Sequence, residues 1–225
     1  MNPLSDHKII HSWKQNASPW IKAIDNDEIE SRITTTNKAI ITQIKKQAPT
    51  SVIDIGCGEG WLVNALAKEG IDTLGIDAIP AFIHYANKHK KGRYKNLSYE
   101  ELATKPVKEK FDLAVSNFSL LGEESVELVF NKVPNLLTPK GGFLVQTIHP
   151  CFVNNIETYT NGWQTGSWKG FNSDFKDPAP WYFRTLSSWS ALFNKNGLSL
   201  RHIYEPKDKT SGQIASIIFY AKLAN

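Results

Sequence analysis

The sequence predicts an α/β fold built on a doubly wound, mainly parallel sheet. From Ser51 onward, short apolar runs of strand length alternate with longer segments of helical period. Each such helix is long enough to cross between two parallel strands. The last two expected strands, 198–204 and 214–223, are joined by only about ten residues, too few for a crossover helix. We therefore expect that final pair to be antiparallel.

Composition and charge indicate one soluble domain over residues 1–225. The chain is long enough for a well-buried core but short for two, with 41% apolar and 21% charged residues. The net charge of +4 is spread over scattered lysines, so a nucleic-acid partner is not expected. Two cysteines cannot form a secreted-type disulfide framework, and no apolar run approaches the ~20 residues of a membrane span. With no signal peptide evident, a cytoplasmic protein without a membrane partner is expected.

Residues 1–50 are predicted to form a helical N-terminal cap ahead of the sheet. Ser18 is expected to cap a helix that has Pro19 in its first turn. The polar run 34–37 is expected to interrupt the helical pattern and to cap a helix over 38–47.

The sheet and its helices follow in regular order. Glycines at 70, 92 and 197 mark helix ends, Pro134 is expected to kink one helix, and 99–102 is read as an acidic turn. The first five strands are expected at 51–55, 73–76, 94–98, 111–116 and 143–147, and the helices at 59–69, 80–91, 123–137 and 187–196, the last capped by serine.

Residues 150–183 have no clear period and form an insert after the fifth strand. A structureless segment that long inside a compact domain is usually a lid or a binding loop. We expect it to wall an acceptor pocket or to pack onto the body, because it is rich in aromatic residues: Trp163, Trp168, Phe171, Phe175, Trp181, Tyr182 and Phe183.

A glycine loop joins the first expected strand to its helix. Gly56, Gly58 and Gly60 alternate directly after Val52–Ile55. A strand that turns sharply into a helix gathers backbone N–H groups at the positive end of the helix dipole. Glycine permits the tight turn and the close approach of a ligand. The loop is therefore predicted to hold a small polar molecule.

The residues around the loop narrow the choice of ligand. No Lys-Ser or Lys-Thr pair follows, as a triphosphate loop requires, and the sixth motif position is Trp61 where a dinucleotide fold has glycine or alanine. Glu59 would also repel a pyrophosphate. A nucleoside without phosphates suits the loop better, because Asp77 can accept from both ribose hydroxyls and Asp54 can face an ammonium.

The run Asp54–Gly60, with Asp77 placed 21 residues after Gly56 and Phe111-Asp112 opening the fourth strand, resembles a class I S-adenosylmethionine-dependent methyltransferase. The resemblance implies a seven-stranded Rossmann-like sheet with the last strand antiparallel. It implies S-adenosylmethionine as cofactor and S-adenosylhomocysteine as product. The function it implies is methyl transfer to O or N of a small-molecule acceptor by in-line displacement, in a monomer or homodimer.

The resemblance also assigns roles in cofactor binding. The three loop glycines would wrap the methionine part and the ribose, and Asp77 would hold the ribose hydroxyls. Arg32 resembles an arginine that grips the cofactor carboxylate, although an i,i+4 pair with Glu28 is an alternative. Ser98 and Tyr99 depart from the usual adenine-binding pair of Asp or Asn and a small residue. The remaining expected contacts are Cys57 and Trp61 in the loop, Ala78 and Ile79 at the adenine, and Asn117 and Phe118 on the methyl-donor side.

Acceptor-side residues are sought after the fifth strand. His149 is a candidate general base, with a structural histidine as the alternative. Trp181 and Tyr182 are candidates for the acceptor pocket. Arg184 is expected either to grip an acidic group of the acceptor or to anchor the insert.

Two further functions stay open at this point. One is an RNA or protein methyltransferase, although the segment 117–120, Asn-Phe-Ser-Leu, lacks the motif of nucleic-acid amino-methylation. The other is a methyltransferase-like protein that binds the cofactor or a partner without catalysis. No metal is expected, because His7 and His11 have ligand-like spacing but no evident third ligand.

Overall fold

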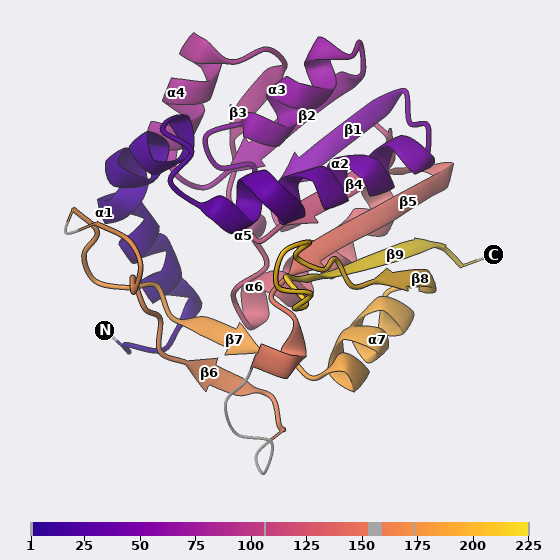
Figure 1. Ribbon diagram of the computed structural model, residues 1–225. Helices are drawn as coiled ribbons and strands as arrows, with labels where there is room; N and C mark the ends of the chain where they lie inside the picture. The colour runs from indigo at the N-terminus through magenta and orange to yellow at the C-terminus, as the bar shows by residue number, and fades with distance from the viewer. Residues whose placement is uncertain (1, 106, 153–158, 173, 225) are drawn as a thin grey trace.

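The computed structural model describes residues 2–105, 107–152, 159–172 and 174–224, and places a seven-stranded sheet at the centre of the chain (Figure 1). The strand order is β3-β2-β1-β4-β5-β9-β8, and β9 runs opposite in direction to the other six strands, pairing antiparallel with both β5 and β8. The predicted fold class is confirmed. The strands are β1 (Ser51–Ile55), β2 (Asp72–Asp77), β3 (Arg93–Asn96), β4 (Phe111–Asn117), β5 (Leu137–Thr147), β8 (Leu198–Tyr204) and β9 (Ile217–Leu223).

Helices cover both faces of the sheet (Figure 1). Alternate residues of β1 point to opposite faces, so Val52 joins one apolar cluster while Ile53 and Ile55 join the other. The cluster with Val52 also contains side chains of α2 (Asn37–Lys46) and α3 (Trp61–Lys68). The cluster with Ile53 and Ile55 contains side chains of α5 (Tyr99–Thr104), α6 (Glu124–Lys132) and α7 (Leu186–Lys195). In the described part of the chain, no helix combines the length and apolar character needed to cross a bilayer.

The N-terminal cap is helical, as predicted, but its first helix begins earlier than expected. Helix α1 runs without interruption over Asp6–Asp25, and Pro19 lies inside it. Its N-cap is Ser5, whose side chain accepts from the backbone N–H of Lys8. Ser18 is exposed and caps nothing, because the buried face of α1 continues past it.

The expected break at 34–37 is also replaced by continuous helix. A π-helical turn, η1 (Arg32–Thr36), leads directly into α2, and Thr36 forms no capping bond. A π turn is unusual and often marks a functional position. Here it sets the orientation of Arg32.

Other element boundaries also differ from the sequence prediction, three of them for a clear local reason. Residues 99–104 form helix α5 rather than a turn, because Ser98 and Glu101 make a reciprocal capping box. The kink expected at Pro134 is the 3₁₀ turn η2 (Val133–Leu136), and β5 starts directly after it. Thr185, not a serine, caps α7.

The insert after β5 contains regular structure of its own, although residues 153–158 and 173 lie outside the described residues. After the short turn η3 (Pro150–Phe152), the strands β6 (Gly162–Gln164) and β7 (Trp181–Phe183) pair antiparallel. The segment between them returns along α1 (Figure 1). Helix α4 (Pro80–His89) lies beside the far part of α1.

Candidate functional site

A cavity of about 410 Å³ lies at the carboxyl edge of the sheet. Its floor comes from the segments that follow β1, β2, β4 and β5, and its cover comes from α1 and from the insert residues Trp168 and Phe171. Doubly wound sheets bind ligands at this edge. The volume is in the range of sites for small molecules and cofactors.

The glycine loop forms part of the cavity wall. Gly56 and Gly58 have φ values of +79° and +55°, which favour glycine. A Cβ on Gly56 would lie 2.4 Å from the Cβ of Ser119, whereas one on Gly58 would meet nothing within 4 Å. The N–H groups of Gly56 and Cys57 both donate to the carbonyl of Ile76. The loop is therefore fixed to β2 and leaves open space at Gly58.

Asp77 ends β2 and anchors the loop. Its Oδ2 accepts from the N–H of Gly58 at 2.9 Å, and its Oδ1 accepts from the N–H of Ile79 at 2.8 Å. Burial raises the pKa of Asp77 to about 6, although these two backbone bonds oppose the shift. The carboxylate is therefore mostly ionised at neutral pH. Each oxygen has a further lone pair with which to accept from a ligand.

Asp54 lies next to the glycine loop, in the strand below it. It is 2% exposed, does not line the cavity, and its Oδ1 has no hydrogen-bond partner among the described residues. Burial, followed by the negative charges of Asp77 and Glu59, raises the pKa of Asp54 to about 8. A cation placed nearby would favour its ionised form.

Arg32 reaches the cavity from the π-helical turn. Its guanidinium lies over the rings of Trp20 and Trp61, with its central carbon 5.4 Å and 5.3 Å from their centroids. Its Nη2 is buried and has no hydrogen-bond partner among the described residues. Desolvation lowers the pKa of Arg32, and the negative charge of Glu59 opposes this. Arg32 therefore presents a buried donor without a partner.

Glu28 does not form an ion pair with Arg32 in this structure. The two carboxylate oxygens of Glu28 accept from the side-chain amides of Asn26 and Asn172. Among the described residues, no ion pair joins Glu28 to Arg32 within 4.0 Å. The alternative of an i,i+4 pair is thus not what the structure contains.

Glu59 and Trp20 were not expected as site residues. Glu59 is 1% exposed, and its Oε2 accepts from the indole Nε1 of Trp20 at 3.1 Å. Its Oε1 is buried without a partner among the described residues. Burial raises the pKa of Glu59, and Arg32 opposes that shift. The bond to Trp20 joins α1 to the glycine loop.

Several other predicted cofactor contacts line the cavity. Asn117 is the last residue of β4, and its buried Oδ1 lacks a partner among the described residues. Phe118 has a φ of +54°, which is uncommon for an aromatic residue and costs energy that the surrounding structure must supply. The phenol of Tyr99 donates to the carbonyl of Ser119 at 3.1 Å. Cys57, Trp61, Ala78 and Ile79 also line the cavity.

Seven predicted site residues do not line the cavity: Asp54, described above, and Gly60, Ser98, His149, Trp181, Tyr182 and Arg184. Gly60, with a φ of +86°, precedes α3, and a Cβ on it would come within 3 Å of the Tyr94 ring. Ser98 caps α5 and has its side chain engaged there. Trp181 and Tyr182 belong to β7, which pairs with β6 beside the sheet rather than over the cavity.

The side chains of His149 and Arg184 are both engaged by other residues, as their structural alternatives predict. His149 is 5% exposed, its Nε2 lies 2.8 Å from Oε1 of Glu205, and its Nδ1 accepts from the N–H of Cys151. Arg184 donates to the carbonyls of Gly122 and Glu123 at 2.7 and 2.8 Å. Neither side chain lines the cavity. The geometry fits a structural histidine and an arginine that anchors the insert.

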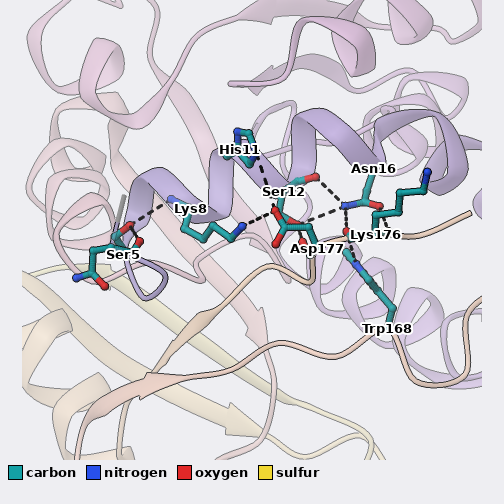
Figure 2. A network of polar contacts seen from close by, with 9 residues as sticks. Ser5, Lys8, His11, Ser12, Asn16, Trp168, Lys176 and Asp177 are labelled. Carbon is teal, nitrogen blue, oxygen red and sulfur yellow. Dashed lines mark hydrogen bonds and ion pairs between the residues drawn. The ribbon is translucent and has the colours of Figure 1, made fainter.

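The insert is bound to α1 by a polar network (Figure 2). Asn16 Oδ1 accepts from the N–H of Lys176, and Asn16 Nδ2 donates to the carbonyl of the same residue, at 2.8 and 2.7 Å. Ser12 Oγ donates to the carbonyl of Asp177 at 2.5 Å, and Lys8 forms an ion pair with the Asp177 carboxylate. Trp168 Nε1 donates to the Lys176 carbonyl. The cavity cover is therefore held in one position on α1.

A family model described as "Methyltransferase domain" matches residues 46–184, which is more than half of the chain. The chain belongs to this methyltransferase domain family. The match includes β1, the glycine loop and Asp77, and it extends through the insert to Arg184.

Two curated proteins are similar to this chain in sequence. Methyltransferase C70.08c of Schizosaccharomyces pombe is 25% identical over 173 residues, which are 74% of this chain and 65% of that protein. Ubiquinone biosynthesis O-methyltransferase of Bartonella tribocorum is 31% identical over 103 residues, which are 44% of this chain and 41% of that protein. The methyltransferase domain thus spans less than two thirds of the length of either relative.

A solved structure matches most of the chain. It is the 1,6-didemethyltoxoflavin-N1-methyltransferase of Burkholderia thailandensis, with bound 1,6-didemethyltoxoflavin and S-adenosylhomocysteine. The TM-score is 0.62 at 14% identity, with 93% of this chain and 87% of that chain covered. This likeness establishes the fold.

Proposed function

We propose that this methyltransferase domain transfers a methyl group from S-adenosylmethionine to O or N of a small-molecule acceptor. When bound, S-adenosylmethionine supplies an electrophilic methyl group on sulfonium sulfur, which an acceptor lone pair displaces in line. The observation that carries the proposal is the buried Nη2 of Arg32, which has no partner in the described part of the chain and lies in the cavity that Gly58 and Asp77 also line. A nucleoside bearing a carboxylate matches that set of groups.

Arg32 is proposed to bind the carboxylate of the cofactor. A planar guanidinium recognises a carboxylate with two parallel bonds, and burial strengthens such bonds. The two indoles that flank Arg32 fix the direction of its donors before any ligand arrives. The cost of burying this cation is met in part by Glu59.

Asp77 is proposed to accept from the ribose hydroxyls, with Ala78 and Ile79 beside the adenine. The backbone bonds from Gly58 and Ile79 hold the carboxylate in place and leave lone pairs for two more donors. Asp54, which lies in β1 beneath the loop, is proposed to attract the ammonium group of the cofactor through the negative charge of its carboxylate. Burial and the negative charges of Asp77 and Glu59 raise the pKa of Asp54, and a cationic group of the ligand would offset these effects.

The cavity cover favours a small acceptor over a polymer. Trp13 and Trp168 pack edge to face, with ring centroids 5.6 Å apart, so α1 and the insert close over the cavity. Such a cover excludes water from the reacting atoms. Two proteins similar to this chain have names that refer to small molecules, a ubiquinone biosynthesis O-methyltransferase and a 1,6-didemethyltoxoflavin-N1-methyltransferase.

The proposal is tested with S-adenosylmethionine radiolabelled on its methyl group and a panel of metabolites. Wild-type protein is expected to move label into an organic-soluble or amine product, while Asp77→Ala does not. Thr210→Ala, at an exposed turn far from the cavity, is the matched surface control. Label transferred only to RNA or to protein would contradict a small-molecule acceptor.

A further inference from the structure

The cavity has two ends, and they differ in chemistry. Along the carboxyl edge of the sheet, Asp77 ends β2, while Gly56 follows β1, Phe118 follows β4 and Ile148 follows β5. The groups proposed to bind the cofactor belong to β2, β1 and η1. The space beside β4 and β5 therefore remains for the acceptor, and we call it the acceptor end.

Apolar and aromatic side chains dominate the acceptor end. Phe118 and Leu121 follow β4, Ile148 follows β5, and Ile9 comes from α1. Trp168 of the insert also lines the cavity, but it packs against Trp13, which joins the cluster of Ile79 and Phe82. Flat or apolar ligand surfaces gain most from such walls.

Basic side chains are scarce around the whole cavity. Within the described part of the chain, Arg32 is the single Lys, Arg or His that lines it, and Arg32 belongs to the cofactor end. Lys8 of α1 and Arg184 at the end of the insert, which stand on segments next to the acceptor end, are both engaged. Lys8 pairs with Asp177, and Arg184 donates to two backbone carbonyls while lying over the Tyr182 ring. An anionic acceptor would find no free cation among these residues.

One carboxylate does line the acceptor end. Asp6, the first residue of α1, reaches the start of α6, where its Oδ2 accepts from the N–H of Glu123 and its Oδ1 accepts from the N–H of Ser125, both at 3.3 Å. The Ser125 hydroxyl also donates to Oδ1. A Cβ on Gly122 would lie 1.9 Å from that oxygen, so glycine is needed for this approach.

Asp6 is therefore a fixed acceptor of hydrogen bonds inside the cavity. The three contacts restrict its carboxylate to one position, and a carboxylate has about four lone-pair sites. The bonds from the start of α6 use only part of the carboxylate's capacity to accept hydrogen bonds. A ligand donor that reaches the remaining lone pairs would gain a charge-assisted bond in a partly dry site.

We infer that the methyl acceptor is a flat, largely apolar molecule without an acidic group, whose N–H or O–H donates to Asp6. This inference rests on the proposed function, because it assigns the other end of the cavity to the cofactor. Asp6 is assigned a binding role at the heteroatom side of the acceptor. The negative charge of Asp6 repels acceptors that carry a carboxylate or a phosphate, and this repulsion sets the specificity.

Four probes that share a naphthalene ring and differ in one functional group test which group the acceptor end prefers. They are 1-naphthol and 1-naphthylamine, which carry a donor, 1-methoxynaphthalene, which lacks one, and 1-naphthoate, which is an anion. Each is titrated by calorimetry into protein saturated with S-adenosylhomocysteine. The two donor-bearing probes are expected to bind about tenfold or more tighter than the other two, the scale of one bond to a charged group.

Variants test the assignment to Asp6. Asp6→Ala should bring 1-naphthol and 1-methoxynaphthalene to within about twofold of each other. Ser125→Ala removes a capping bond from the same carboxylate but should keep the donor preference. If Asp6→Ala does not fold, Asp6→Asn is used, and it should reduce the preference several-fold because neutral acceptors form weaker bonds.

Three results would overturn the inference while leaving the proposed function intact. They are binding of 1-naphthoate as tight as that of 1-naphthol, no binding of the donor-bearing probes to loaded protein, or equal loss of preference in Ser125→Ala and Asp6→Ala. Failure of S-adenosylhomocysteine itself to bind would overturn the proposed function and the inference with it.

Discussion

The indole of Trp20 donates to the buried carboxylate of Glu59 across 3.1 Å, and this bond connects the N-terminal helix to the glycine loop. The two residues are 39 positions apart. Because Trp20 also lies under the Arg32 guanidinium, the cap contributes directly to the shape of the cofactor end. The cap is thus part of the site and not only a cover for the sheet.

Replacing Trp20 by Phe should destabilise the protein by about 1–3 kcal/mol, the cost of leaving a buried acceptor unpaired. Chemical denaturation gives the free energy of unfolding. Trp163→Phe is the matched control, since Trp163 donates to Glu123 in a less buried pair, and it should cost less. Equal losses in the two variants would contradict a special role for the Trp20–Glu59 bond.

Arg32→Lys should weaken S-adenosylhomocysteine binding about 10- to 100-fold, because a lysine cannot form the bidentate bond to a carboxylate. Binding of 5′-methylthioadenosine, which has no carboxylate, should change little. Calorimetry of both ligands provides the comparison, with Arg93→Lys as a control at an exposed ion pair. Similar weakening for both ligands would mean that Arg32 acts on the fold rather than on the carboxylate.

Cofactor binding should release a proton near pH 7. The free protein holds Asp54 mostly protonated at that pH, because its pKa is raised to about 8. An ammonium beside it favours the ionised form and lowers that pKa, so binding expels the proton and affinity rises from about pH 6 to pH 8. Titrations of S-adenosylhomocysteine in buffers of different ionisation enthalpy measure the release. Asp54→Asn should abolish most of it, and an unchanged release would exclude Asp54 as the source.

Asn16→Ala should loosen the insert. The variant loses both bonds to the Lys176 backbone, which are the most direct link between α1 and the insert. Hydrogen exchange followed by mass spectrometry should show faster exchange in peptides covering 162–177 and no change in β4. Asn64→Ala, which removes a single bond to the N–H of Lys91, serves as the control. Unchanged exchange over 162–177 would show that other contacts hold the cover.

The glycine loop and Asp77 were predictable because their signal is local. Strand, turn and helix start follow one another within about a dozen residues, and each position has a physical reason for its residue type. The antiparallel final pair was predictable from loop length alone. These parts of the fold needed no knowledge of distant contacts.

Other parts depended on contacts that no local pattern contains. Ser18-Pro19 has the form of a helix start, yet the buried face of α1 continues through it. Asp6 meets Ser125 across 119 positions, and Trp20 meets Glu59 only because α1 folds back over the loop. For His149 and Arg184 the sequence left open a site role or a structural role, and only the contacts with Glu205 and with the backbone at the start of α6 distinguish the two.

The assignment of the cavity to S-adenosylmethionine rather than to a dinucleotide is tested by calorimetric titration of wild-type protein with S-adenosylhomocysteine and, separately, with NAD⁺. We expect saturable one-to-one binding of S-adenosylhomocysteine and its strong loss in Asp77→Ala. We expect no binding of NAD⁺, because its pyrophosphate would meet Glu59. Binding of NAD⁺ with no detectable binding of S-adenosylhomocysteine would contradict this assignment.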